Sequence, residues 1–211
     1  PNAIIHADKG YLGSFSGDEH GYFGGGYQYQ FQLYPAVRFC RIDRLDFTTE
    51  TDSQATFAYL PSQRMYLEGM SSRRYGYFIG GSETINVGPY PAEVTRVEFS
   101  TETKSLNPVA HPAGVWKHST FDNNLFGYVV GGQIPSVGIV CTIRRLDFTT
   151  DTWANTTNNM QTTIFTHCTN QDDSYGYTIG GTTPNFSPGT TSKINRLEFS
   201  TETTSQPGDI Q

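Results

Sequence analysis

Short runs of alternating apolar and polar residues fill this chain, and two of these runs return four times. The first is Gly-Tyr, two small or mostly apolar residues and Gly-Gly, and it begins at residues 21, 76, 127 and 176. The second is Arg-x-Asp/Glu-Phe followed by a Thr-rich stretch, and it begins at residues 44, 96, 145 and 196. Successive copies lie about 50 residues apart, a period typical of propellers and other repeat arrays.

Each run predicts a β-strand. The first ends in paired glycines, which favour positive φ or close approach of backbone at the start of a loop. In the second, period-two alternation places Leu45 and Phe47 on one face and Arg44 and Asp46 on the other. We interpret the recurrent Arg and acid as a structural charge pair on each strand; the alternative is a ligand contact. The Thr-rich stretch predicts a tight turn whose side chains bond the local backbone.

Four strands per repeat predict an all-β fold, a four-bladed β-propeller of four-stranded antiparallel blades. We expect a single domain over residues 1–211, with repeats beginning near residues 21, 76, 127 and 176. Residues 9–16 align with residues 64–71, so residues 1–20 should complete the blade that begins at 176. N- and C-terminal strands that share one blade would close the ring and remove exposed edges. The alternative is a segment of a longer array, since the chain begins at Pro1 without a Met.

Composition narrows the classes of function. Abundant Gly, Tyr and Phe, with only 16% charged residues, fit strands and turns better than helices. A net charge of −6 argues against nucleic acid as a partner, which requires a basic stripe. No apolar run approaches the roughly 20 residues of a membrane span, so we expect no membrane insertion. Cys40, Cys141 and Cys168 show no metal-like spacing, and we interpret them as free, buried small residues.

The sequence offers no catalytic constellation, and we predict neither an enzyme nor a cofactor. The five His lack metal-ligand spacing, so we predict no metal site. His118 and His167 fall in the predicted innermost strands, where a structural role is expected. Four carboxylates in equivalent positions argue against a catalytic pair, which is needed only once. Small residues in the innermost strands (Ser14, Gly69, Thr120 and Cys168) suit a narrow axis.

Loops after the Gly-Gly pairs carry the candidate binding residues. In the first loop, Tyr or Phe alternates with Gln from Tyr27 onward, which places aromatic residues on one face. This face packs on its own blade or forms an exposed surface for a sugar or a neighbouring subunit. The candidate partner- or ligand-binding residues are Tyr27, Tyr29, Phe31, Tyr34, Tyr90 and Phe186.

The order of strand, Tyr-x-x-Gly-Gly, variable loop, strand with Asp, Thr-rich turn and Trp resembles the kelch repeat. The best match joins Tyr128–Gly132 to Arg145–Trp153. Only this copy has the Trp; Asp52, Lys104 and Thr204 stand in its place elsewhere. The amino-acid sequences of the two recurrent runs are more similar to the divergent kelch-like repeats of bacteriophage tail and virion proteins, marine and cyanobacterial ones especially.

This resemblance implies a structural or adhesion module of a virion or another extracellular assembly, folded in a reducing cytosol before release. It would work through protein–protein contacts at its loops. The expected partners are further copies of the chain or a larger virion or fibre assembly. The alternative is a lectin-like propeller that binds cell-surface glycans through its aromatic loops.

Overall fold

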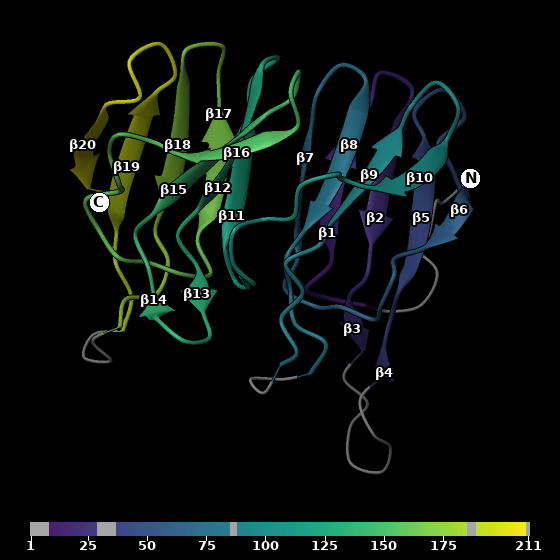
Figure 1. Ribbon diagram of the computed structural model, residues 1–211, viewed down its shortest axis with the longest axis horizontal. Coiled ribbons are helices and arrows are strands. Elements are labelled where there is room, and N and C mark those ends of the chain that lie inside the picture. Colours follow the sequence, from purple (N-terminus) through teal and green to yellow (C-terminus); the bar gives the residue numbers. More distant parts are fainter. Residues whose placement is uncertain (1–8, 29–36, 85–87, 185–188, 210–211) are drawn as a thin grey trace. The chain divides into compact units, whose positions relative to one another are not determined.

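The computed structural model describes residues 9–28, 37–84, 88–184 and 189–209, and all regular structure in these ranges is β-strand. The predicted all-β class is therefore confirmed. The chain forms two compact units, unit 1 of Pro1–Gly114 and unit 2 of Val115–Gln211. Figure 1 draws unit 1 in purple to teal and unit 2 in green to yellow.

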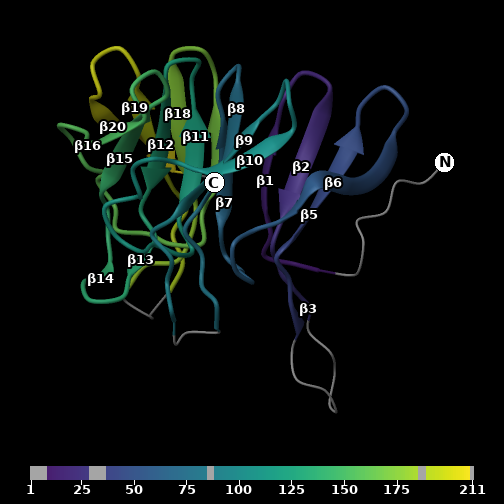
Figure 2. The ribbon, with the colours of Figure 1, turned by 45° about the vertical axis from the view of Figure 1, so that its right-hand side comes forward.

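Unit 1 contains two four-stranded antiparallel sheets and one small hairpin. The first sheet has the order β1 (Gly13–Ser16), β2 (His20–Gly24), β5 (Arg41–Asp46), β6 (Thr51–Tyr59). The second has the order β7 (Glu68–Ser71), β8 (Tyr75–Ile79), β9 (Val94–Glu98), β10 (Thr103–Leu106). The hairpin is β3 (Tyr27–Gln28) with β4 (Val37–Arg38), and it extends beyond the Gly-Gly end of the first sheet (Figure 2).

Unit 2 repeats this plan. Its first sheet has the order β11 (Ser119–Asp122), β12 (Phe126–Val130), β15 (Ile143–Asp147), β16 (Thr152–Asn155). Its second has the order β17 (Cys168–Gln171), β18 (Tyr175–Ile179), β19 (Lys193–Glu198), β20 (Thr204–Asp209). The hairpin is β13 (Gln133–Ile134) with β14 (Gly138–Ile139). Four such sheets are consistent with the blades of a four-bladed propeller; that they form one domain over residues 1–211 stays a prediction.

The predicted sharing of one sheet by the two ends of the chain is not seen among the described residues, and closure of a ring stays a prediction. Among the described residues, β1 pairs with β2 in the first sheet, and the fourth sheet takes all four strands from Cys168–Asp209. A tight turn, in which Gly17 N–H donates to His20 O, folds β1 back onto β2. Each repeat therefore begins near residues 13, 68, 119 and 168. A repeat period measures the length of a unit, whereas its starting point depends on such turns.

Glycines sit where side chains would clash. All four Gly-Gly pairs have positive φ, as predicted. A Cβ on Gly76 would overlap the ring of Phe15, and one on Gly176 would lie 2.5 Å from the ring of Phe121. The glycine of the Gly-Tyr run in the second sheet of each unit therefore makes room for an aromatic side chain of the first sheet.

Non-glycine residues with positive φ mark two further repeat positions. Four of them lie two residues before the first strand of each sheet: Tyr11, Tyr66, Lys117 and Thr166. The other four lie in the Thr-rich turns: Glu50, Glu102, Asp151 and Glu202. Because such backbone is uncommon for these residue types, its fourfold recurrence indicates that the sheet geometry imposes it.

The two units have equivalent cores between their sheets. Tyr22 stacks on Phe99 in unit 1 with ring centroids 5.9 Å apart, and Tyr128 stacks on Phe199 in unit 2 at 5.4 Å. In each pair the Tyr comes from the first recurrent run and the Phe from the second. The recurrent aromatic residues therefore hold neighbouring sheets together.

The structure corrects two predictions about small residues. Cys40 and Cys141 are free and only half-buried, each against the core of its own unit, and Cys168 is exposed. The register also places Thr169, not Cys168, at the position of Ser14, Gly69 and Thr120. Ser14, Gly69, Thr120 and Thr169 all lie seven residues before the Gly of their Gly-Tyr run, whereas Cys168 lies one residue earlier and so on the opposite face of its strand.

Candidate functional site

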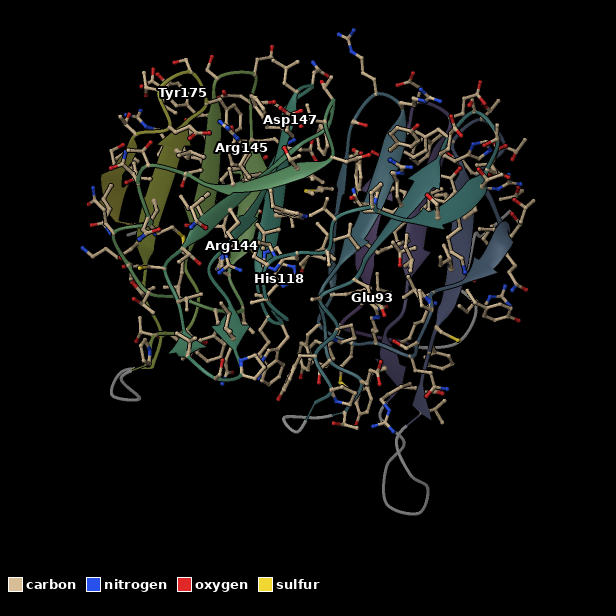
Figure 3. All side chains as sticks on the ribbon, in the orientation of Figure 1. Glu93, His118, Arg144, Arg145, Asp147 and Tyr175 are labelled. Carbon is tan, nitrogen blue, oxygen red and sulfur yellow. The ribbon has the colours of Figure 1, made fainter. Side chains whose placement is uncertain are left out.

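The recurrent acid of each sheet is committed to its own turn. Figure 3 labels Arg145, Asp147 and Tyr175 near the Thr-rich end of unit 2. Asp147 Oδ1 accepts the backbone N–H groups of Thr149 and Thr150 at 2.8 and 3.0 Å. Two Thr hydroxyls in each of the four turns also lie 2.8 Å apart. The predicted local bonding in these turns is confirmed.

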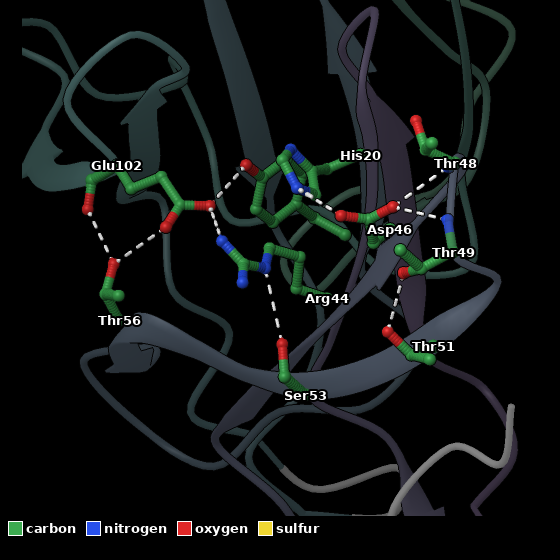
Figure 4. A network of polar contacts seen from close by, with 10 residues as sticks. His20, Arg44, Asp46, Thr48, Thr49, Thr51, Ser53, Thr56 and Glu102 are labelled. Carbon is green, nitrogen blue, oxygen red and sulfur yellow. Dashed lines mark hydrogen bonds and ion pairs between the residues drawn. The ribbon is translucent and has the colours of Figure 1, made fainter.

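In the first sheet of each unit, the recurrent Arg pairs with a different acid from the one predicted. Arg44 Nη1 donates to Glu102 Oε1 at 2.7 Å, in the turn of the neighbouring sheet, and the Tyr22 hydroxyl donates to the same oxygen at 3.0 Å (Figure 4). Arg145 makes the equivalent ion pair with Glu202 in unit 2. The charge pair is thus structural, but it joins two sheets because the long Arg side chain reaches past its own strand.

The ionisation of this network fits a structural role. Burial opposes the charged form of Glu102, yet hydrogen bonds from Arg44 and Tyr22 hold its pKa below the usual value. Burial, and then the bond to Glu102, raises the pKa of Tyr22. Burial raises the pKa of Tyr128 to about 12. None of these three groups exchanges a proton near pH 7.

The predicted aromatic loop residues are only partly described. Tyr27 is buried, which favours packing on its own unit over exposure. Tyr90 is half-buried, and its ring lies beside Gly88. The other predicted residues lie outside the described part of the chain: Tyr29, Phe31, Tyr34 and Phe186.

Unit 1 also holds an aromatic pair that the sequence reasoning missed. The rings of Tyr11 and Tyr66 lie 4.5 Å apart, and Tyr66 N–H donates to Tyr11 O. Tyr11 is 58% exposed. The two tyrosines occupy one repeat position, so an alignment of the innermost strands could have found the pair.

The unit 1 cleft is a hollow of about 350 Å³ at the turn ends of the two sheets. Its first wall is residues 17–20 with Tyr22, and its second wall is residues 73–74 with Phe99 and Ser100. Arg74 is held by Glu98 at 2.7 Å, and His20 Nε2 lies 3.5 Å from Asp46 Oδ2. The volume falls within the about 300–1,000 Å³ typical of small-molecule sites.

The unit 2 cleft occupies the same repeat position and has a volume of about 400 Å³. Its lining is entirely polar: Asp122, Asn123, Asn124, Gln171, Asp172 and Asp173. Asn123 Oδ1 accepts the N–H groups of Leu125 and Phe126, and Gln171 bonds Asp122. Equivalent turns thus present different chemistry in the two units.

Several buried or half-buried ionisable groups lie away from the clefts. Burial lowers the pKa of His167 to about 4 and lowers the pKa of Arg144. Burial raises the pKa of Glu68 to about 7. His118 is 2% exposed and, like Arg144, lies further from the turns than Arg145 (Figure 3). His118 and His167 directly precede the first strand of their sheets, next to the predicted position within those strands.

The structure offers two further observations on ligands and membranes. Within residues 9–28, 37–84, 88–184 and 189–209, no three His, Cys, Asp or Glu side chains are arranged to hold a metal ion. The same part of the chain contains no helix that could cross a bilayer.

Comparisons with known proteins support the fold alone. No family model matches the chain, and no curated protein matches it. Among solved structures, the chain is similar to the structure of YjhT, with 14% identity and a TM-score of 0.77, over 100% of this chain and 68% of that chain. The result agrees with an all-β fold of antiparallel four-stranded sheets. It does not bear on the kelch-like and bacteriophage resemblance, which remains one of sequence.

Proposed function

We propose that this protein is a non-enzymatic structural or adhesion module of a virion, tail fibre or other extracellular assembly. One observation carries the proposal: the described contacts of the recurrent acids and arginines hold turns, strands of one sheet and neighbouring sheets together. The side chains at the turn ends differ between the two units, as in the two clefts. Rigid scaffolds that vary at their rims commonly serve recognition. The sequence resemblance to kelch-like phage repeats adds the biological setting.

Sedimentation equilibrium over a wide range of protein concentration tests the assembly role. We expect reversible self-association, because such modules act as parts of symmetric objects. A constant monomer mass at the highest soluble concentration would argue against assembly by this chain.

Carbohydrate binding is the second candidate, and the unit 1 cleft favours it. This cleft combines an aromatic ring with charged side chains of both signs, a combination suited to a ligand with apolar faces and many hydroxyls. A glycan array probed with the whole labelled chain tests this function. Signal on at least one class of glycan is expected, and a blank array would remove the candidate.

A further inference from the structure

We infer that the unit 1 cleft is a subsite for one neutral hexose unit, with Phe99 as its stacking surface. The inference rests on the carbohydrate-binding candidate and names its site and ligand class. It differs from the aromatic loops predicted from the sequence, because the cleft lies at the turn end of the sheets. Four features support it: Gly17, Phe99, the carboxylates of Asp18 and Glu19, and the guanidinium of Arg73.

Gly17 lies against the Phe99 ring, which lines the cleft. A Cβ on Gly17 would lie 3.2 Å from two atoms of that ring. The backbone does not require glycine here, since φ of Gly17 lies outside the left-handed region. The missing side chain therefore leaves room for the ring beside the cleft. The part of an aromatic ring that lines a cleft suits the C–H face of a pyranose.

The rim offers hydrogen-bonding groups that the fold does not use. Asp18, Glu19 and Arg73 are exposed, and their side chains make no hydrogen bond or ion pair within the described ranges. Two carboxylates accept hydrogen bonds and a guanidinium donates them, whereas a sugar hydroxyl does both. An anionic ligand would be repelled by Asp18 and Glu19, and a cationic ligand by Arg73. The mixed rim thus favours a neutral polyol.

Unit 2 supplies an internal comparison. Asn123 stands at the position of Gly17, and its side chain is used to bond the turn. Phe199, the counterpart of Phe99, does not line the unit 2 cleft. The same scaffold thus has a polar cleft without a stacking surface, and we expect no hexose there.

The test is a saturation-transfer difference NMR titration of the whole chain. The probes are the α- and β-methyl glycosides of glucose, galactose and mannose, at up to about 10 mM, which half-saturates a site with a Kd of about 10 mM. At least one should bind. Gly17→Asn should weaken it about tenfold or more, because the side chain would cover Phe99. Arg73→Ala, at a side chain without a described partner, should weaken it about fivefold with an unchanged melting temperature. Asn124→Ala in the unit 2 cleft is the matched control and should change nothing.

The outcomes separate the site from the function. Binding that survives both Gly17→Asn and Arg73→Ala would overturn the assignment of the cleft and leave carbohydrate binding intact. A glycan-array signal without any hexoside binding would overturn the ligand class. A blank array together with no hexoside binding would remove both the function and the site.

Discussion

Units 1 and 2 differ in chemistry at a buried position that precedes two strands of each unit, and they keep the same sheets around it. The position lies four residues before the first strand of each sheet and holds Lys9 and Arg64 in unit 1 but Val115 and Ile164 in unit 2. All four side chains are at most 2% exposed. A side chain must therefore fill this buried position, but that side chain can be charged or apolar.

Each charged side chain at this position forms an ion pair with an acidic residue. Lys9 Nζ lies 2.7 Å from Asp43 Oδ2, and Arg64 Nη2 lies 2.6 Å from Glu93 Oε2. A buried cation is tolerated only when an acid offsets its desolvation. The comparison teaches that unit 1 uses ion pairs where unit 2 uses apolar packing. Such pairs add little net stability, but their halves are costly to separate.

The largest effect should come from separating the Lys9–Asp43 pair. Asp43→Ala leaves a buried ammonium without its acid and should lower the free energy of unfolding by about 3–5 kcal/mol. The double variant Lys9→Val/Asp43→Ala imitates Val115 and should recover most of the loss. Urea unfolding measures both. A loss below about 1 kcal/mol in the single variant would show that Lys9 reaches water.

Acid should destabilise the protein through His167 in unit 2. Below pH about 6.5 the unfolded chain binds a proton at His167 that the folded unit accepts only near pH 4. Stability should therefore fall by up to about 3 kcal/mol as pH drops through this window. His167→Leu installs the residue that unit 1 has at Leu67 and should flatten the profile. An unchanged slope in unfolding experiments from pH 7 to pH 4 would contradict the burial of this ring.

Glu68 in unit 1 should have the opposite pH dependence. Its folded pKa of about 7 exceeds the unfolded value of 4.5, so stability is lost as pH rises through this window. Because the residue is half-buried, screening reduces the effect to about 2 kcal/mol. Glu68→Gln should therefore stabilise the protein at pH 8 and have little effect at pH 4.5. Equal effects at the two pH values would rule out a raised pKa.

At the equivalent glycines Gly76 and Gly176, the loss of stability caused by a Gly→Ala substitution should depend on the space around the added methyl group. Gly76→Ala and Gly176→Ala should each cost about 1–3 kcal/mol, because the added methyl meets Phe15 or Phe121. The Gly76 variant should cost more, since its overlap is tighter. Thermal unfolding of the two variants gives the ranking, and the reverse order would mean that Phe15 moves aside more readily than Phe121.

The smallest difference in stability between the units should appear when the two ion pairs between sheets are broken. Glu102 accepts side-chain bonds from Arg44, Tyr22 and Thr56, whereas Glu202 is paired with Arg145. Glu102→Gln should cost about 1–2 kcal/mol, and Glu202→Gln about 0.5–1 kcal/mol. Chemical unfolding with both variants measures the gap. Equal losses would show that Tyr22 and Thr56 add nothing to the pair.

Local features of the fold were predictable from the sequence, but the residue at which each sheet begins was not. Gly-Gly pairs and Thr-rich turns depend on neighbouring residues, so their geometry followed from residue type. The start of each sheet depends on a turn such as the one at Gly17, which the repeat period does not reveal.

The clefts depend on contacts between repeats, and the sequence did not expose them. Gly17 and Phe99 come from different sheets, and Arg44 finds Glu102 58 positions away. No spacing rule links such residues. The aromatic loop drew attention because of its composition, yet the described member that opens it, Tyr27, is buried.

The central claim is that one scaffold carries a sugar subsite in unit 1 and none at the same place in unit 2. The most direct measurement is the backbone ¹H–¹⁵N spectrum during titration with the methyl hexosides. The account predicts that the amide of Gly17 shifts with increasing ligand while the amide of Asn123 stays in place. Shifts confined to Asn123, or an unmoved Gly17 at saturation, would contradict it.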